Sequence, residues 1–457
     1  MKFPKYFSFF ILCICVLSSQ NLFAVNDKRI HEDMLSNGMK VLVKEDHRVP
    51  IVVSQVWYKV GSSYEPGGST GMSHVLEHMM FKGTTENPDD SFNQIIARNG
   101  AEDNAFTSRD YTAYYQKLEA SRLEISFQLE ADRMRNLVFS KNDFDKEVAV
   151  VQEERRWRTD DKPQARAYEQ LFVSAFENSG YHHPIIGWMD DLENLTLEET
   201  KVWYQKYYSP NNATLVVVGD VDPKAVFKLA EKHFGPIKAD IVGPPKPIVE
   251  RHQFGSKKIK MHLPAKVPYL IFGYKVPSLL TLTDDSKWEA YALELLAHVL
   301  DGGDSTRLPY NLVKKQQLAA SVSSSYSSYA RLQTLFMVDV TPAQSKTIDE
   351  VYQSLKHELN RVRTETVTVD ELERVKNQII AANVFEQDSI FYQAMKLGVA
   401  ETTGLGWQIN DHYIENIRKI TPDQVLAVAR KYLIEEQMTE VQVIPSEKLN
   451  QTKNKTN

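Results

Sequence analysis

The segment His74–His78, which reads HVLEH, combines residue types that can hold a metal ion and use it. Two histidines one helical turn apart lie on the same helix face, so both imidazoles can reach one ion. Glu77 lies beside them, where it can take a proton from a bound water without being a ligand. A catalytic zinc usually has three protein ligands and one open position, so the motif predicts a zinc site that still lacks one ligand.

A second acidic segment, SKNDFDKEVAVVQEERRW, can supply that ligand. A capping pattern at Ser140 predicts that a helix starts there. On this helix Glu147 and Glu154 are seven residues apart and share a face, with Val150 and Val151 between them. A bound cation would explain two carboxylates on an apolar face, because burying an unpaired charge is unfavourable. The spacing leaves both glutamates open as the third ligand.

The HVLEH segment must itself be helical for this chemistry. Ser69 or Thr70 can cap the start of a helix, and Gly83 can end it. The alternative is a solvated pair of histidines with the glutamate as an ordinary helix charge. The adjacent His182 and His183 are different, because neighbouring residues do not face one way, and we expect them to be ordinary histidines rather than ligands.

Two segments far apart in the sequence are similar. VPIVVSQVWYKVGS from Val49 and VPYLIFGYKVPS from Val267 both read as strands rich in β-branched and aromatic residues. Each precedes a helical segment, HVLE from His74 and HVLD from His298. The repeat predicts two domains of a common fold. Gly302 stands where the first copy has its second histidine, so the chemistry is expected in the first half.

Strands and helices mix without a strict alternation, so we predict an α+β fold built from two homologous α/β domains. A segment rich in proline and charge resembles a linker between the halves. The predicted divisions are an N-terminal catalytic zinc domain (25–240), a linker (241–258), a homologous non-catalytic domain (259–445) and a disordered polar tail (446–457).

The N-terminal residues read as an export signal. Lys2 and Lys5 precede an apolar run, residues 7–17, that is too short to span a bilayer comfortably, and Ala24 offers a cleavage site. We therefore predict a signal peptide over residues 1–24; the alternative is an uncleaved anchor. No later apolar run is long enough to cross a membrane.

Composition narrows the location and the function classes. Both cysteines of the chain lie inside the predicted signal peptide, so the mature chain has no cysteine for a disulfide, a metal or a nucleophile. The formal net charge of −6 does not suggest a nucleic-acid binder. An exported, cysteine-free, acidic chain fits a bacterial periplasm.

The motif is that of the inverzincins, the inverted form of the common zinc-protease motif. Its surroundings resemble the insulinase or pitrilysin family of zinc metallopeptidases, which includes the mitochondrial processing peptidase. The segments NAFTSRDYTAYY and YYSPNNATLVVVGDVDP also resemble that family. The matching motif positions are Gly61, Gly71, Ser73, His74, Glu77, His78, Gly83 and Thr84.

The resemblance implies a role for each candidate residue. His74, His78 and Glu154 would bind one Zn²⁺ per chain, and Glu77 would be the general base. Glu147 would lie behind the ligands and orient a histidine. An edge strand would bind extended peptides through the residues Asn104, Ala105, Phe106 and Thr107.

One segment departs from the family pattern. Many members carry an arginine and a tyrosine in the second half that are thought to hold the substrate carbonyl. In the segment LVKKQQLAASV here, Val313 and Ala320 take those places, and neither can donate a hydrogen bond. Tyr326 is nearby in sequence but does not match the position.

The resemblance also implies architecture. The family's active unit is a clamshell of four similar domains, so this chain would form half of it and act in a dimer. A heterodimer with a homologous chain that carries the arginine and tyrosine would restore the missing donors.

We therefore predict a zinc-dependent endopeptidase that hydrolyses extended peptides or unfolded segments in an enclosed chamber. The alternatives are a non-catalytic structural subunit of the same family and a protein that captures peptides without cutting them.

Overall fold

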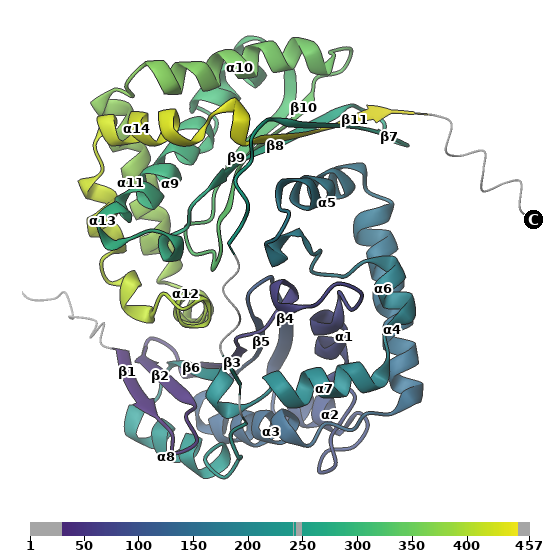
Figure 1. Cartoon of the computed structure of the whole chain (residues 1–457). Coiled ribbons are helices and arrows are strands. Elements are labelled where there is room, and N and C mark those ends of the chain that lie inside the picture. Colours follow the sequence, from purple (N-terminus) through teal and green to yellow (C-terminus); the bar gives the residue numbers. More distant parts are fainter. Residues whose placement is uncertain (1–29, 241, 244–248, 447–457) are drawn as a thin grey trace, which may run out of the picture.

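The structure, a computed structural model, describes residues 30–240, 242–243 and 249–446. Two β-sheets with helices packed on them form two lobes (Figure 1), which confirms the predicted α+β class. The predicted signal peptide and residues 447–457 of the predicted tail lie outside the described residues. None of the helices in the described ranges is long and apolar enough to cross a membrane.

The first lobe is built on a six-stranded sheet in the order β1-β2-β6-β3-β5-β4. The strands are β1 (Ile30–Met34), β2 (Lys40–Glu45), β3 (Ile51–Tyr58), β4 (Glu102–Thr107), β5 (Thr112–Glu119) and β6 (Ala213–Gly219). Its helices are α1 (Met72–Met79), α2 (Ser91–Arg98), α3 (Leu123–Arg135), α4 (Lys141–Arg155), α6 (Met189–Asn194), α7 (Leu197–Tyr207) and α8 (Pro223–His233).

The second lobe is built on a five-stranded sheet in the order β7-β11-β8-β10-β9. Its strands are β7 (Lys257–Leu263), β8 (Tyr269–Val276), β9 (Ala319–Ser325), β10 (Thr334–Pro342) and β11 (Met438–Pro445). Its helices are α9 (Trp288–Asp301), α10 (Ile348–Thr364), α11 (Val369–Glu386), α13 (Tyr413–Lys419) and α14 (Pro422–Tyr432).

The two sheets have the same topology. In each sheet one early strand pairs in parallel with the strand that comes last in the sequence: β2 with β6, and β7 with β11. All the other strand pairings that the two sheets share are antiparallel. The segments from Val49 and Val267, predicted to be related strands, contain the corresponding strands β3 and β8. The sequence repeat therefore reflects a repeated fold, with β1 as an addition to the first copy.

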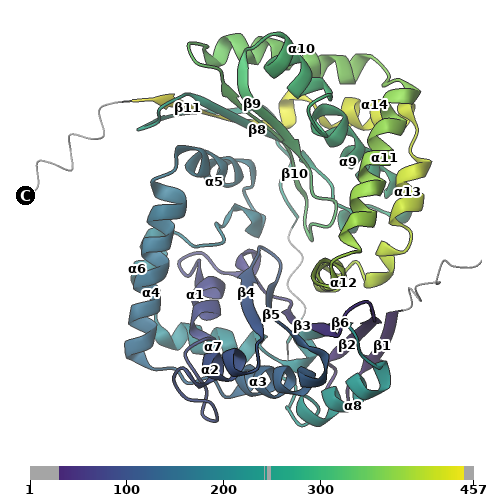
Figure 2. The same ribbon diagram turned by 180° about the vertical axis from the view of Figure 1, so that it is seen from behind.

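One helix from each half of the chain packs on the sheet of the opposite lobe. Helix α5 (Pro163–Ala175) packs on β8 and β11 of the second sheet, and α12 (Ile390–Thr403) packs on β3 and β6 of the first. Figures 1 and 2 show both helices between the lobes, each against the sheet of the opposite half. This exchange produces two buried apolar clusters, each formed by residues from both halves of the chain. The lobes are thus held together by core packing.

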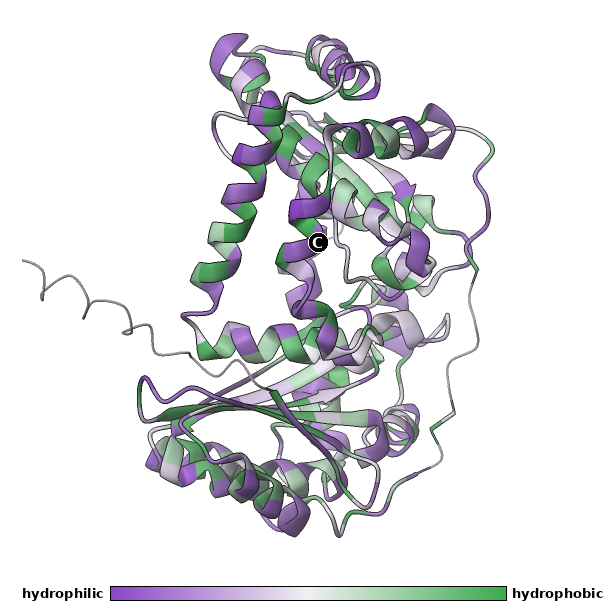
Figure 3. Cartoon of the chain, turned by 90° about the vertical axis from the view of Figure 1, so that its left-hand side faces the viewer, coloured by the Kyte–Doolittle hydropathy of each residue, from purple (hydrophilic) through white to green (hydrophobic). Residues whose placement is uncertain are grey.

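Helix α12 comes very close to the first sheet at one glycine. A Cβ atom on Gly398 would lie 2.0 Å from Cε2 of Trp57, a fully buried side chain of β3. Only a residue without a side chain permits this distance. In Figure 3 the central strands are largely hydrophobic and the helices striped, as expected for sheets covered on their faces.

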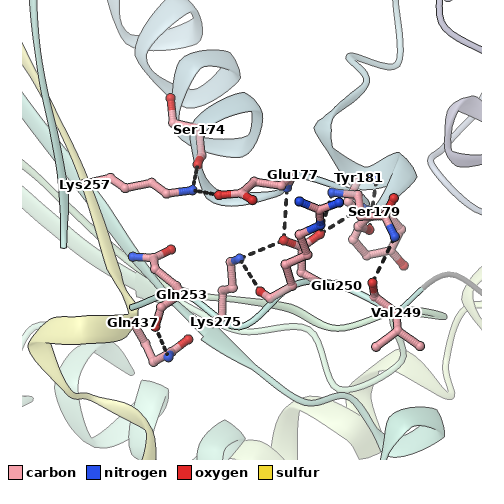
Figure 4. A network of polar contacts seen from close by, with 12 residues as sticks. Ser174, Glu177, Ser179, Tyr181, Val249, Glu250, Gln253, Lys257, Lys275 and Gln437 are labelled. Atoms are coloured by element: carbon pink, nitrogen blue, oxygen red, sulfur yellow. Dashed lines mark hydrogen bonds and ion pairs between the residues drawn. The ribbon is translucent and has the colours of Figure 1, made fainter. Parts of the chain in front are cut away.

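The predicted linker is only partly a surface segment. Its end is already in β7, which starts at Lys257. The side chain of Glu250 is buried, and its carboxylate accepts hydrogen bonds from the backbone N–H groups of residues 177–179 and from Lys275 Nζ, which is 2.8 Å away (Figure 4). Gln253 is also buried and donates to the carbonyl of Met438. This segment therefore ties the lobes together.

Candidate metal centre and active site

Helix α1 presents the HVLEH motif, but its start differs from the prediction. The residue before the helix is Gly71, with φ of +86°, and neither Ser69 nor Thr70 caps it. The buried carboxylate of Glu65 takes that role from outside the helix, because it accepts hydrogen bonds from the N–H groups of Gly71 and Ser73 at 2.8 and 2.7 Å. The helix also ends at Met79, before Gly83.

Helix α4 brings the third candidate ligand to this helix. Ser140 caps its start by accepting a hydrogen bond from the N–H of Asp143, as predicted. Nε2 of His74 and Nε2 of His78 lie 3.8 and 3.5 Å from Oε2 of Glu154. One ligand atom of each of these residues lies within 4.8 Å of the others, so the group could hold a metal ion.

The geometry and the donor set fit zinc. Ligand atoms at zinc-bonding distance around a tetrahedral ion lie roughly 3.3 Å apart, and the distances here are slightly longer. Burial, with a smaller contribution from neighbouring His78, lowers the pKa of His74 to about 3, so this imidazole is neutral at pH 7 and keeps a free lone pair. Two imidazoles and a carboxylate are a known zinc ligand set.

Glu147 lies behind His78. Its Oε2 is 3.0 Å from Nδ1 of His78, and its Oε1 is 2.5 Å from Nζ of Lys82. An ionised carboxylate only accepts hydrogen bonds, so Nδ1 carries the hydrogen and Nε2 is left free to face Glu154. Glu147 thus selects the imidazole tautomer that a metal needs.

Glu154 is held from the opposite side. Arg158 lies in the wider π-type turn Arg156–Asp160 that continues α4, and its guanidinium is 2.6 Å from Oε1 of Glu154. This contact occupies one carboxylate oxygen and leaves Oε2 to the histidines. The neighbouring Arg155 binds Glu169 of α5 at 2.8 Å, which fixes the end of α4. Val150 does not share the buried face, since its side chain is exposed.

Glu77 lies beside this group without belonging to it. Its carboxylate accepts a hydrogen bond of 2.5 Å from the Thr107 hydroxyl. Burial raises the pKa of Glu77 above the ordinary carboxyl value, while this hydrogen bond lowers it. A carboxylate with raised basicity next to a metal group is suited to accept a proton.

Strand β4 forms one wall of the site. It is the edge of its sheet and, among the described strands, pairs only with β5, so no strand covers its other side. The predicted substrate-binding residues lie on it: Asn104, Ala105, Phe106 and Thr107. They line a cavity of about 1160 Å³ together with His74, Glu77, His78 and Glu154. The structure thus brings every predicted site residue except Glu147 to one cavity, with Glu147 directly behind it.

His182 and His183 line the same cavity, which their adjacent spacing did not indicate. His183 is buried, and burial together with the neighbouring His182 lowers its pKa to about 4. Neither belongs to the metal group found among the described residues. Also missed were Arg158 and Lys82; the only sequence signal was the (i, i+4) spacing of Glu154 and Arg158.

All the described residues that line this cavity come from the first half of the chain, so no described residue of the second lobe offers it a donor. Val313 packs against the core of the second lobe, and Ala320 is an exposed residue of β9. The Tyr326 hydroxyl donates to the carbonyl of Pro277 at 2.8 Å, so it is already engaged.

Comparison with known proteins now identifies the family. Residues 40–187 match the model of the insulinase family, peptidase family M16, and residues 194–379 match the peptidase M16 inactive domain. The chain is 33% identical to the zinc protease PqqE of Helicobacter pylori over 351 residues, or 76% of this chain and 78% of that protein. The chain belongs to the insulinase family, peptidase family M16.

Other members of the M16 family are similar over most of the chain. The zinc protease YmxG of Bacillus subtilis, of uncharacterised function, is 26% identical over 88% of this chain and 95% of its own. The crystal structure of a protease from Helicobacter pylori has a TM-score of 0.86 at 29% identity and covers 92% of this chain and 100% of that chain.

Similarity in fold extends further. The Escherichia coli periplasmic protease PqqL has a TM-score of 0.78 at 19% identity, with 92% of this chain matched to 48% of that one. The chain is therefore a half-clamshell of two homologous α/β domains, as predicted, and this fold fills about half of PqqL.

Proposed function

We propose that the chain is a zinc-dependent endopeptidase that hydrolyses extended peptides or unfolded segments. One observation carries the proposal. Nε2 of His74, Nε2 of His78 and Oε2 of Glu154 converge in one cavity with Glu77 beside them and the free edge of β4 along the wall. Relatives that are named zinc proteases support it.

Each residue of the site would have its own role in amide hydrolysis. Zinc held by His74, His78 and Glu154 would acidify a water and polarise the scissile carbonyl. Glu77 accepts the proton of the attacking water and returns a proton to the leaving amine. Glu147 keeps His78 in the liganding tautomer.

Strand β4 positions the substrate. An extended peptide adds to its free edge through backbone hydrogen bonds, so binding is tolerant of sequence. Because Thr107 at the end of this strand contacts Glu77, a peptide paired with β4 passes the general base. Asn104, Ala105 and Phe106 supply the backbone of that edge.

We further propose that the chain is the zinc-bearing subunit of a dimer, most simply a heterodimer. A tetrahedral oxyanion needs donors beyond the metal, and Val313, Ala320 and the engaged Tyr326 supply none. A homologous chain with an arginine and a tyrosine would provide them. The extent of PqqL, twice that of the matched fold, supports pairing of two such halves.

Export to a bacterial periplasm is the location that we propose. The basic and apolar N-terminal segment and the cysteine-free remainder support it. The similarity to PqqL, a periplasmic protease of Escherichia coli, agrees with this location.

A second candidate function is a non-catalytic subunit that binds or scaffolds peptides. The match of residues 194–379 to the peptidase M16 inactive domain favours it. The intact metal group argues against it, since a scaffold has no use for a base placed beside three ligand atoms.

The test is cleavage of a quenched fluorescent peptide library by the purified chain loaded with zinc. We expect cleavage by the wild type, and loss of at least a hundredfold in Glu77→Gln with zinc content unchanged. Glu198→Gln, an exposed residue of α7, is the matched control and should cleave normally. Normal turnover by Glu77→Gln would refute the assignment. A chain that contains zinc but cuts only when a homologous subunit is added would support the heterodimer.

A further inference from the structure

The turn that joins β4 to β5, residues 108–111, is fixed from several sides. The N–H groups of Ser62 and Ser63 donate to the carbonyls of Ser108 and Arg109 at 3.1 and 2.8 Å. A Cβ atom on Gly61 would lie 2.2 Å from the Ser108 carbonyl oxygen, so only glycine allows this approach. The turn is therefore a rigid end to the strand that lines the active-site cavity.

Asp110 locks this turn to the second lobe. Its buried carboxylate accepts hydrogen bonds from the Ser63 hydroxyl at 2.9 Å and from the Tyr181 hydroxyl. Arg331, from the loop between β9 and β10, donates to it through Nε at 3.1 Å and through its backbone N–H at 3.2 Å. The charge of Asp110 is thus fully engaged and cannot serve its neighbour Arg109.

Arg109 faces the active-site cavity instead. Its guanidinium carbon lies 3.9 Å from the ring centre of Phe172 and 5.9 and 5.8 Å from those of Tyr168 and Tyr181. Stacking on aromatic rings orders a guanidinium while leaving its N–H edge free. Within the described part of the chain, the Arg109 side chain has neither an acidic partner nor a hydrogen-bond acceptor.

The other charged side chains of the cavity already have polar partners. Arg158, the second arginine in the lining, contacts Glu154. Of the three lining acids outside the metal group, Glu153 and Glu169 bind Arg156 and Arg155, and Glu77 accepts the hydrogen bond of Thr107. Arg109 is therefore an ordered cation that lacks its counter-charge at the place where a peptide would lie.

We propose that Arg109 binds a substrate carboxylate, so that the chain favours peptides with an acidic group close to the scissile bond. This inference rests on the proposed peptidase function. Thr107, the last residue of β4, contacts Glu77, and Arg109 follows two residues later in the turn that ends the strand. Because Arg109 and Glu77 line the same cavity, a peptide on the edge of β4 that passes Glu77 brings a residue near the cut toward this guanidinium. A planar guanidinium and a carboxylate pair through two parallel hydrogen bonds.

The experiment uses a quenched fluorescent peptide that the full chain cleaves at one site, with Glu, Gln or Lys placed in turn at each position flanking the cut. At one position we expect kcat/KM for Glu to exceed that for Gln roughly tenfold or more. Arg109→Gln should abolish this preference without changing cleavage of the neutral peptide more than severalfold. Arg109→Glu should invert the preference toward Lys. Peptides that end near the cut, as the free acid or the amide, test whether a C-terminal carboxylate binds Arg109 as well as a Glu side chain does.

Arg156→Gln is the matched control, because it removes a positive charge at the end of α4 that does not line the cavity. It should keep the wild-type preference. If Arg109→Gln slows all peptides equally, or if Arg109→Glu does not invert the preference, Arg109 only supports the aromatic cluster and the proposal fails.

A second readout separates this inference from the peptidase proposal. Labelled Glu and Gln peptides are bound to full-length Glu77→Gln, with and without Arg109→Gln, and followed by fluorescence anisotropy. Tighter binding of the Glu peptide that depends on Arg109 supports the carboxylate site even if no cleavage occurs. Equal binding of both peptides refutes it even if cleavage is normal.

Discussion

At the scale of single residues, the contact of Glu147 with His78 yields a test of the metal group. Glu147→Gln keeps the size of the side chain but loses the charge that favours the hydrogen on Nδ1 of His78. We expect zinc affinity to fall roughly 10- to 100-fold, as for other carboxylates behind a ligand histidine. Competition with a chromogenic chelator measures it. Asp145→Asn, an exposed residue of the same helix, is the control, and equal affinity of the two variants would contradict this role.

At the same scale, the sequence alone predicted those site residues whose relative positions are set within a single helix. The four-residue and seven-residue spacings place His74 with His78 and Glu147 with Glu154 because helical geometry alone sets them. Contacts between elements could not be predicted: the Thr107 hydroxyl on Glu77 depends on how β4 lies against α1. No sequence pattern singled out Arg109, because an arginine without an acidic partner can be recognised only when the contacts of the surrounding side chains are known.

At the scale of elements, the close approach of α12 to the first sheet gives a stability prediction. Gly398→Ala would place a Cβ atom 2.0 Å from the buried Trp57 ring, so the helix or the ring must shift. The overlap should cost about 1–3 kcal/mol, against a gain of about 1 kcal/mol from alanine in a helix, so we expect the unfolding free energy to fall by up to about 2 kcal/mol. Urea unfolding measures it. Gly67→Ala, where a Cβ meets nothing within 4 Å, is the control, and equal stability would show that α12 is loosely docked.

The elements themselves were largely predictable, and their partners were not. The β-branched and aromatic content of the segments from Val49 and Val267 predicted β3 and β8 correctly. The cap of α1 was wrong, because Glu65, six residues before Gly71 and not adjacent to the helix, reaches its N–H groups. The exchange of α5 and α12 left no trace in the sequence, since an amphipathic helix does not specify which sheet it covers.

At the scale of the whole molecule, the two lobes are joined by the exchanged helices and by the ion pair of Arg331 with Asp110. Glu250 adds a third connection, because it accepts hydrogen bonds from the backbone of residues 177–179 and from Lys275. The second lobe therefore contributes to the candidate site by fixing the turn that ends β4. None of its described residues lines the cavity itself, which agrees with the proposed need for a partner chain.

The buried pair of Glu250 and Lys275 predicts how the joined lobes respond to acid. Burial alone would raise the pKa of Glu250, but hydrogen bonds from three backbone N–H groups and from Lys275 lower it from 4.5 to about 2. A carboxyl whose pKa is lower in the folded state stabilises it above pH 4.5, and this contribution is lost as pH falls toward 2. The shift corresponds to at most about 3 kcal/mol at neutral pH, and solvent screening reduces it.

Glu250→Gln should therefore lower unfolding free energy by about 3 kcal/mol or more at pH 7, because it also leaves Lys275 buried without its counter-charge. The difference from wild type should narrow steadily below pH 4.5. Chemical unfolding of both chains at several pH values between 7 and 3 measures it. Glu177→Gln, whose exposed side chain pairs with Lys257, should change stability little at any pH. A difference that stays constant down to pH 3 would mean that the ionisation of Glu250 does not hold the lobes together.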